Sequence, residues 1–584
     1  MGLKWFMTSL VAGLMASTVV ANPLSSRTST TRHKKRSCVK PCFNSPEDRS
    51  CWTPGWDIHT NFEEEVPITN VTRTYNLSIT NVTSWDGADG VAKPVMLING
   101  GFPGPTIEAD WGDEVEIHVT NNLQHNGTSL HWHGIWQKYT NTMDGANGCT
   151  ECPIPPGTTR TYKFLMRQYG TGWYHSHFSA QYGNGVVGML KINGPASANY
   201  DVDLGPYPIT DWYYDTADRL ERASQFSDHG PPPDSDNVLF NGTHVNAEGG
   251  GRYAKTVLTP GKKHLLRLVN PSVDNTFTLS LVGHKFTVIA ADFVPIEPVE
   301  KDTLFMTTGQ RYDVIIEADQ EIGNYWFNAT LASSGMCGTT VIDHPAAIFS
   351  YEGAPEDELP TDPGAPVDAG CADETDLVPV VPKSAPRDDF LAHKNYLDVA
   401  VTLQPYGEKS VYRWKINDSD IDIEWGRPIL EYVREGNYSW PRQANVIEVE
   451  EANVWTWWII ENGSRMPHPM HLHGHDTMLL GVGAGEFDPA NHTDLLNFDN
   501  PTRRDVVQMP GSSWIAIAWR TDNPGVHLMH CHIAWHVSQG LSVQFLERSS
   551  EIAQTVDLHE IEPNCAAWRE YEATAVYPKH DSGL

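Results

Sequence analysis

Histidine is concentrated in four short strings of this sequence, HWHG, WYHSH, HPMHLHGH and HCHIAWH, which hold eleven of its 25 histidines. Alternate residues of a β-strand face the same side, so an H-x-H pair on a strand can direct two imidazoles at one point. Eight imidazoles from four strand ends therefore predict a cluster of several metal ions. The four pairs are His131/His133, His175/His177, His471/His473 and His530/His532.

Cys531 indicates which metal is bound. It is followed five residues later by His536, and with the distant His468 these residues can form a trigonal His₂Cys set. Imidazole suits several metals, but a thiolate favours a soft one, and His₂Cys is typical of blue-copper sites. The usual weak axial ligand would lie further along the loop, where Leu541 stands. Because leucine cannot donate, we expect a three-coordinate copper with a raised reduction potential.

The neighbours of Cys531 predict how the two sites are connected. On a strand, His530 and His532 face away from the side that Cys531 occupies. We expect them to bind the cluster while Cys531 binds the single copper, so that sulfur, backbone and imidazole join an electron-accepting site to an oxygen-reducing one. His475, the remaining histidine of HPMHLHGH, is needed by neither site and is expected to be structural.

Two other kinds of site account for these histidines less well. A zinc site often uses three histidines, far fewer than the eight imidazoles of the H-x-H pairs. A copper protein that binds or transfers electrons without turnover would need only His468, Cys531 and His536. It would leave the eight other histidines unexplained.

The strands that must position these residues belong to a repeating pattern. WGDEVEIHVTNN (residues 111–122), TPGKKHLLRLVN (259–270) and EEANVWTWWIIEN (450–462) each read as a turn, an apolar-rich strand and a final Asn. Three such segments at domain spacing, with Gly, Pro and Asn every ten residues or so, predict three related all-β domains. The Pro/Asp/Gly-rich segment 353–387 is predicted to be an inter-domain linker.

Composition and the N-terminus indicate a secreted protein. The 584 residues carry a formal net charge of −32, which argues against nucleic-acid or anionic-membrane partners. The apolar run after Lys4 predicts a signal peptide over residues 1–21, and HKKR predicts a propeptide over 22–36. No later apolar run is long enough to span a membrane. N-linked glycans are expected at some of ten N-x-S/T sites, namely Asn70, Asn76, Asn81, Asn126, Asn241, Asn328, Asn417, Asn437, Asn462 and Asn491.

In order, spacing and flanking residues, the four strings resemble those of the multicopper oxidases, and more closely the laccases of filamentous ascomycetes. The resemblance extends over nearly the whole mature chain, through INGGFPGPTIEADWGD, YGTGWYHSHFSAQYGNGVVG, RTDNPGVHLMHCHIAWHVSQGLSVQFLE and the final DSGL. It implies an all-β fold of three cupredoxin-like Greek-key domains. These would cover residues 37–194, 195–380 (with the linker and no copper) and 381–584.

The resemblance also implies a cofactor of four copper ions, with ligands in the first and third domains. Type 1 copper would be bound by His468, Cys531 and His536, with Leu541 at the axial position as a non-ligand. Type 2 copper would be bound by His131 and His471. The type 3 pair would be bound by His133, His175, His177, His473, His530 and His532.

Further roles follow from the resemblance. Asp144 would be the acid near type 2 copper, whereas Asp505 is expected to be structural. Glu248 is the nearest candidate for a carboxylate that accepts the phenol proton, although a solvated loop residue is an equal alternative. The terminal DSGL resembles a plug that enters the channel to the cluster.

Three disulfides are implied in the same way, and a fourth by parity. The family pairs Cys42 with Cys51, Cys152 with Cys565, and Cys337 with Cys371. An odd total of nine cysteines, with Cys531 needed as a thiolate, leaves Cys38 and Cys149, which would then bond to each other.

The implied function is that of a secreted, monomeric laccase that oxidises phenols and reduces O₂ to water. Lignin-derived phenols, pigment precursors and host defence compounds are all compatible substrates. An ascorbate oxidase would usually carry Met where Leu541 stands, and a membrane ferroxidase would carry a C-terminal anchor. A copper-binding or electron-transfer protein without turnover is the alternative from a different class.

Overall fold

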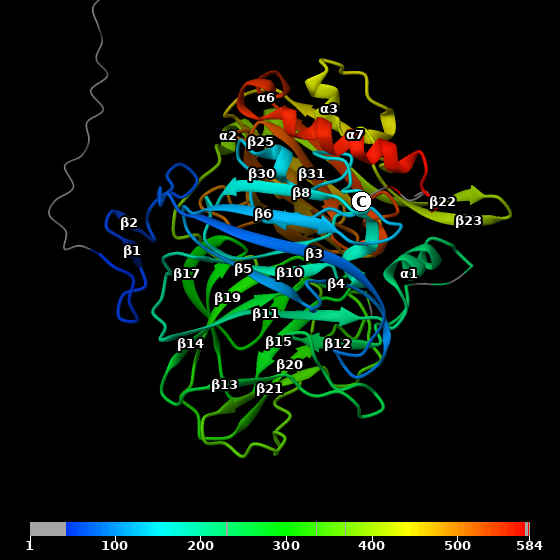
Figure 1. Cartoon of the computed structure of the whole chain (residues 1–584). Coiled ribbons are helices and arrows are strands. Elements are labelled where there is room, and N and C mark those ends of the chain that lie inside the picture. Colours follow the sequence, from blue (N-terminus) through cyan, green and yellow to red (C-terminus); the bar gives the residue numbers. More distant parts are fainter. Residues whose placement is uncertain are drawn as a thin grey trace, which may run out of the picture. The chain divides into compact units, whose positions relative to one another are not determined.

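The computed structural model describes residues 42–228, 230, 232–334, 336–367, 369–577 and 582. The predicted signal peptide and propeptide lie outside these residues. A two-stranded hairpin, β1 (Cys51–Thr53) and β2 (Trp56–Asp57), is followed along the chain by three pairs of larger sheets (Figure 1). This confirms the predicted all-β fold of cupredoxin-like domains. The exact domain boundaries remain predictions.

The first sheet pair contains two of the four histidine strings. Strand β6 (Glu114–Asn121) alternates between partly buried and buried residues, so one of its faces lies in the core, whereas β9 (Gly170–His175) is buried along its whole length. Ile117, Trp132 and Leu190 lie in this core and are fully buried. One sheet has the order β4-β3-β6-β8, with β3 (Thr72–Trp85), β4 (Lys93–Ile98), β6 (Glu114–Asn121) and β8 (Thr159–Leu165). The other has the order β5-β10-β9-β7, with β5 (Gly104–Asp110), β7 (His131–His133), β9 (Gly170–His175) and β10 (Val187–Asn193).

The second sheet pair contains none of the predicted copper ligands. Its six-stranded sheet has the order β12-β11-β14-β19-β16-β17, with β11 (Val202–Trp212), β12 (Asn237–Phe240), β14 (Lys263–Val269), β16 (Phe286–Ala291), β17 (Val294–Lys301) and β19 (Arg311–Glu317). Its five-stranded sheet has the order β13-β21-β20-β15-β18, with β13 (Lys255–Leu258), β15 (Phe277–Leu281), β18 (Leu304–Met306), β20 (Asn324–Thr330) and β21 (Ala346–Tyr351). Helix α1 (Ala217–Ser224) interrupts the connection from β11 to β12.

The third sheet pair contains the other two histidine strings. Its six-stranded sheet has the order β23-β22-β25-β30-β27-β28, with β22 (Lys394–Tyr406), β23 (Lys409–Ile416), β25 (Trp455–Asn462), β27 (Thr477–Ala484), β28 (Arg503–Arg504) and β30 (Ser513–Arg520). Its five-stranded sheet has the order β24-β32-β31-β26-β29, with β24 (Val446–Val449), β26 (His468–Leu472), β29 (Val506–Met509), β31 (Gly525–Cys531) and β32 (Ser542–Glu547). The helices here are short: α2 (Arg387–His393), α3 (Ile429–Arg434), α4 (Pro489–His492) and α5 (Ala534–Val537).

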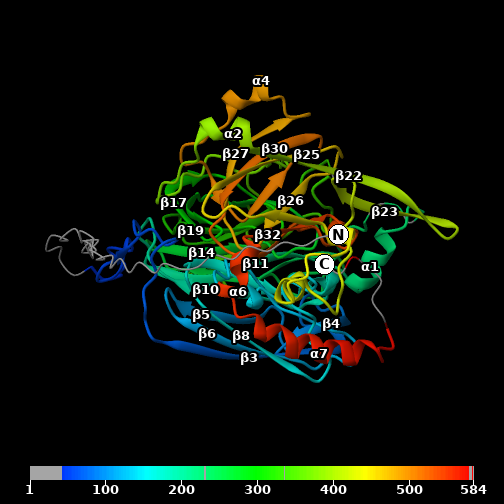
Figure 2. The ribbon, with the colours of Figure 1, turned by 90° about the horizontal axis from the view of Figure 1, so that it is seen from above.

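The chain ends in two helices, α6 (Ser549–Thr555) and α7 (Ile561–Glu572). Helix α7 returns to the first sheet pair and lies beside β8 in both views (Figures 1 and 2). The disulfide Cys152–Cys565 fastens it there, and Cys42–Cys51 and Cys337–Cys371 are also formed. All three disulfides that the resemblance implied are therefore confirmed. Within the described residues, no helix is both long and apolar enough to cross a membrane.

The predicted glycosylation sites differ in exposure. Asn462 is 3% exposed and Asn328 is 8% exposed, so both lie in the protein interior. The Asn462 side chain donates hydrogen bonds to the carbonyls of Met466 and Pro510. The other eight asparagines are exposed or half-buried. Glycosylation at all ten sites is thus incompatible with the fold.

Candidate metal centre

Strand pairing brings the histidine strings together two by two. In the first sheet pair, β7 runs antiparallel to β9, and His131 lies opposite His175. In the third, β26 runs antiparallel to β31, and His471 lies opposite His530. Each strand, with the residues directly after it, contributes the two histidines of one H-x-H string, which face the same side. Four imidazoles therefore lie together at the end of each strand pair.

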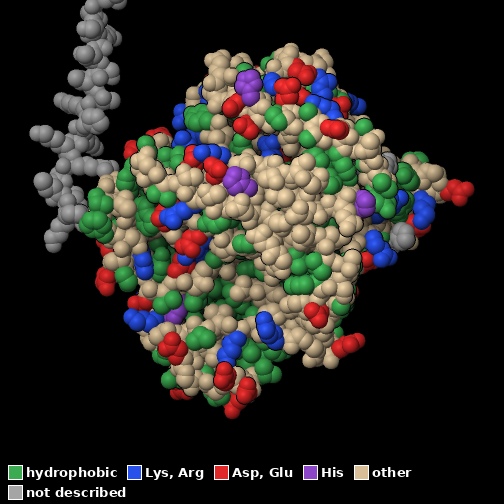
Figure 3. All heavy atoms as spheres, in the orientation of Figure 1, with side chains coloured by type: hydrophobic (Ala, Val, Ile, Leu, Met, Phe, Trp, Pro, Cys, Tyr) green, Lys and Arg blue, Asp and Glu red, His purple; other side chains and the backbone are tan. Residues whose placement is uncertain are grey.

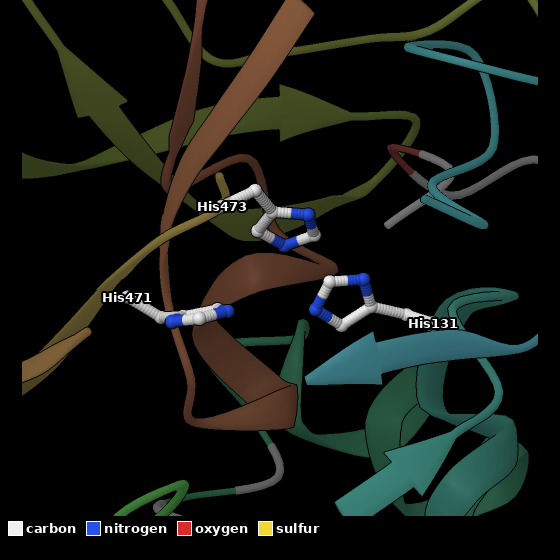
Figure 4. Close-up of side chains that lie close together, drawn as sticks. All are labelled: His131, His471 and His473. Atoms are coloured by element: carbon white, nitrogen blue, oxygen red, sulfur yellow. The ribbon is translucent and has the colours of Figure 1, made fainter. Parts of the chain in front are cut away.

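The two sets of imidazoles meet between the first and third sheet pairs. His473 Nε2 lies 3.3 Å from His530 Nε2, and His532 Nε2 lies 3.2 Å from His133 Nδ1. The rings of His131 and His473 have centroids 3.9 Å apart. Figure 4 shows His131 from β7 pointing toward His471 of β26 and His473, which directly follows that strand, and their ligand atoms lie within 4.8 Å of one another. The structure thus gathers the eight predicted cluster histidines into one pocket, namely His131, His133, His175, His177, His471, His473, His530 and His532.

Burial and hydrogen bonding make these imidazoles suitable metal ligands. Each of the eight is at most 4% exposed. Buried polar atoms nearly always have a hydrogen-bond partner, yet several ring nitrogens here have none among the described residues, namely His131 Nε2, His175 Nε2, His177 Nδ1 and Nε2, His471 Nε2 and His532 Nδ1. Burial, with the neighbouring imidazoles, also lowers the pKa of His177 and His530 well below the ordinary value, as it does for most of the set. Neutral imidazoles with unpaired nitrogens are what a metal cluster requires.

A second group of candidate ligands surrounds Cys531. Its Sγ lies 3.6 Å from Nδ1 of both His468 and His536, and the two nitrogens are 3.2 Å apart. Burial raises the pKa of the Cys531 thiol and lowers the pKa of His536 to about 3. A thiolate at this position therefore needs a bound cation to stabilise it. Leu541 is fully buried in the same core, and its apolar side chain offers no donor.

Asp144 contacts two of the cluster imidazoles. It follows the short helix η1 (Asn141–Met143) and is 2% exposed. Its Oδ2 accepts a hydrogen bond from His473 Nδ1 at 2.8 Å, and its carbonyl oxygen accepts one from His131 Nδ1 at 2.9 Å. These bonds direct the Nε2 atoms of both rings into the pocket.

Asp505, expected from the sequence to be structural, has an equivalent place on the other side of the cluster. Its Oδ1 accepts a hydrogen bond from His133 Nε2 at 3.1 Å, and its carbonyl oxygen accepts one from His471 Nδ1 at 3.0 Å. Arg311 from the second sheet pair binds both carboxylate oxygens, at 2.7 and 2.6 Å. Burial alone would raise the pKa of Asp505, but Arg311 and His471 hold it below the usual range. Asp505 and Arg311 are therefore positioning residues that the local sequence RRD did not reveal.

Other predicted residues lie away from the two sites. Glu248 is in an exposed turn, where its backbone N–H bonds to Asn246 Oδ1 at 2.9 Å, and no contact with a cluster or Cys531-site residue is found among the described residues. His475 Nε2 lies 3.0 Å from Glu547 Oε2 rather than in the cluster, as expected for a structural residue. Cys149 is buried and has no disulfide partner among the described residues, and Cys38 lies outside them, so their pairing stays a prediction.

Of the terminal DSGL string, Ser582 is the residue that the structure describes. It is 8% exposed. Its N–H donates to the Ser538 carbonyl at 3.3 Å, and its hydroxyl donates to the Val537 carbonyl at 3.0 Å. This part of the chain end therefore packs against the residues that directly follow His536.

The chain is similar to known proteins over most of its length. Residues 79–197, 205–354 and 404–551 each match a multicopper oxidase domain family. Similar proteins include Laccase-1 of Melanocarpus albomyces, 52% identical over 93% of this chain and 90% of the relative. The Laccase of Neurospora crassa is 48% identical over 99% of this chain and 97% of the relative.

Solved structures show the same relationship. The crystal structure of the laccase from Botrytis aclada is 39% identical, with a TM-score of 0.86 over 93% of this chain and 100% of that chain. Fet3p, described as a multicopper oxidase that functions in iron import, is 26% identical, with a TM-score of 0.75 over 86% of this chain and 96% of that chain. The three matched domains and the similarity to these relatives over most of the chain show that it belongs to the multicopper oxidase family.

Proposed function

We propose that the protein is a laccase, which oxidises phenols one electron at a time and reduces O₂ to water. The observation that carries the proposal is the position of Cys531 between His530 and His532. The thiol lies beside His468 and His536, while the two flanking imidazoles reach the cluster. Relatives named laccases, about half identical over most of the chain, support the same activity.

Copper fits the donor set, because a thiolate with two imidazoles selects copper and the buried ring nitrogens lack other partners. Four ions per chain are proposed. His468, Cys531 and His536 would hold type 1 copper, with Leu541 beside it as a non-ligand, and His131 and His471 would hold type 2 copper. The type 3 pair would be held by His133, His175, His177, His473, His530 and His532. Copper supplies one-electron oxidation at the first site and dioxygen reduction at the cluster.

The protein's own residues supply positioning, connection and protons. The Cys531 backbone provides a short covalent connection between the two groups of ligands. Reduction of O₂ consumes protons, and Asp144, whose carboxylate contacts His473, is placed to hold one beside the cluster. Glu248 remains a sequence-based candidate for accepting the phenol proton, and its exposed position gives it no support.

The same proposal includes secretion as a monomeric glycoprotein after removal of residues 1–21 and 22–36. Disulfides among the described residues support an oxidising compartment. The predicted domains at residues 37–194, 195–380 and 381–584 are part of this proposal, and the three matched segments each lie mainly within one of them. Phenols from lignin, pigment precursors or host defence are the proposed substrate class.

Oxygen uptake by the purified copper-loaded protein tests the function. We expect rapid uptake with 2,6-dimethoxyphenol and much slower uptake with ascorbate or Fe(II). We also expect four copper ions per chain and the intense visible absorption of a blue-copper thiolate, which Cys531→Ser should abolish. Faster turnover of ascorbate or Fe(II) than of the phenol would favour another member of the family. Binding of a single copper without oxygen uptake would contradict enzymatic function altogether.

A further inference from the structure

A groove of about 790 Å³ lies outside both groups of copper ligands. Three parts of the chain line it: the N-terminal region and first sheet pair (Glu63, Lys138, Arg167), the segment before α2 (Lys383) and the third sheet pair (Trp455, Arg520). Its volume is in the range of clefts that bind small organic molecules. None of its lining residues is a proposed copper ligand.

The charge of the groove is opposite to that of the whole protein. The chain has 73 acidic and 41 basic residues, and on the face shown in Figure 3 side chains of both signs are interspersed. The groove lining contains three acidic side chains, Glu63, Glu64 and Asp522, against six basic ones, namely Lys138, Arg167, Lys383, Arg503, Arg520 and Arg548. A concave surface lined by one sign of charge concentrates ligands of the other sign.

Two of the basic side chains have no acidic partner among the described residues. Lys383 and Arg503 share Glu63, each at 2.5 Å, and Lys138 pairs with Asp522 at 3.2 Å. Arg548 pairs with Glu551.

By contrast, Arg520 donates its Nε–H to the Asn453 carbonyl at 3.2 Å, and Arg167 lies 5.9 Å from the centre of the Tyr139 ring. A guanidinium presents paired N–H donors that match the oxygens of a carboxylate or phosphate. Arg167 and Arg520 thus have free donor capacity inside an electropositive groove.

The uncharged residues of the lining can contact the carbon skeleton and polar groups of an organic ligand. Tyr139 is 44% exposed, and Trp455 is half-buried beside Lys383, whose Nζ lies 5.5 Å from the ring centre. Asn61 and Asn453 add amide groups. We propose that this groove binds a multivalent oxyanion, a small polycarboxylate or a phosphate, through Arg167 and Arg520.

Calorimetric titration of the copper-loaded protein at constant ionic strength tests the proposal. The probes are tricarballylate, inorganic phosphate and, as the monovalent comparison, acetate. We expect one site per chain for tricarballylate or phosphate, with acetate binding at least about tenfold more weakly, since acetate forms fewer charged hydrogen bonds with the two guanidinium groups. The tighter of the two multivalent probes identifies the ligand class. Equal affinity for acetate, or no binding of either multivalent probe, would overturn the proposal.

The double variant Arg167→Gln/Arg520→Gln should bind the multivalent probe about tenfold or more weakly than the parent. Lys262→Gln/Lys285→Gln is the matched control, because it removes the same charge at exposed ion pairs outside the groove. The single variant Arg520→Gln, at an exposed position, provides a second test if the double variant melts at a lower temperature. Unchanged affinity in a folded arginine variant, or an equal loss in the control, would contradict the site. Because binding is measured without turnover, failure here leaves the oxidase proposal untouched.

Discussion

At the scale of single residues, most cluster imidazoles are oriented by a hydrogen bond. The ring nitrogen that faces away from the pocket donates it to a carboxylate or carbonyl oxygen. Asp144 and Asp505 supply such oxygens for two rings each. The carbonyls of Ser176 and Cys531 do the same for His175 and His530, at 3.0 and 2.8 Å. These bonds fix the tautomer of each ring and therefore which nitrogen is available to a metal.

Asp144→Asn tests the acid beside the cluster. The amide keeps the size of the side chain but cannot hold a transferable proton and disturbs the bond from His473. We expect the visible absorption of the Cys531 site to persist while oxygen turnover slows about 10–100-fold. Stopped-flow reoxidation of the reduced enzyme measures this step directly. Asp86→Asn, at an exposed aspartate, is the control, and equal rates in both variants would remove Asp144 from the mechanism.

Asp476 should make stability depend on pH. Its carboxyl oxygens are buried, and burial, with Asp505 and Glu63, raises its pKa to about 8 from an ordinary value near 3.8. Between these values the folded protein holds a proton that the unfolded chain has released, so the free energy of unfolding falls as pH rises.

We therefore expect Asp476→Asn to raise the melting temperature relative to the parent progressively from pH 4 to pH 8. Asp522, whose pKa is lowered in spite of burial because His475 and Lys138 lie nearby, provides the contrast. The stabilising contribution of Asp522 is lost as pH falls through its pKa in the folded protein. We therefore expect Asp522→Asn to melt below the parent at neutral pH, and this difference to become smaller at low pH. Parallel melting curves for parent and Asp476→Asn across the range would refute the assignment.

At the scale of elements, the turn after η1 determines where Asp144 points. Gly145 has a φ of +83°, and a Cβ there would lie 1.9 Å from the Leu130 carbonyl oxygen. Leu130 directly precedes His131 at the start of β7. The turn and the ligand strand are therefore in direct backbone contact.

Gly145→Ala should displace this turn. We expect a loss of about 1–3 kcal/mol in the free energy of unfolding and a lower copper content of the cluster, measured by denaturation and metal analysis. Gly157→Ala is the matched control, because Gly157 has a φ of +77° but a Cβ there would meet nothing within 4 Å. If both variants lost similar amounts of unfolding free energy and copper, the positive φ alone would explain the effect, and the contact with Leu130 would not be needed.

The strands and the site differ in how far the sequence could predict them. The H-x-H spacing predicted which imidazoles would share a face, and the three repeated segments predicted related β-domains, because both follow from the alternation of a strand. Asp505 was expected to be structural, but its contact with His133 could not be predicted, because it spans 372 positions and depends on how separate sheets pack. Glu248 was a candidate because the family resemblance implied a carboxylate in the corresponding loop, and a loop of different length does not fix which residue takes that place.

At the scale of the whole molecule, the fold decides which predicted glycosylation sites are reachable. Glycan mapping of the purified protein should find Asn462 and Asn328 unmodified, because both are buried and the Asn462 amide donates hydrogen bonds to two carbonyls. Exposed sites such as Asn76 and Asn241 should carry glycans in part of the population. A glycopeptide containing modified Asn462 would contradict the packing described for this strand end.

The division of the cluster between the first and third sheet pairs has a consequence for biogenesis. During synthesis, His131 to His177 leave the ribosome long before His471 to His532, and a nascent chain cannot complete the pocket until its last strands have emerged. The bond between Cys152 and Cys565 closes later still. Metal acquisition should thus be one of the final events of maturation, and retained copper would report that the entire polypeptide has folded.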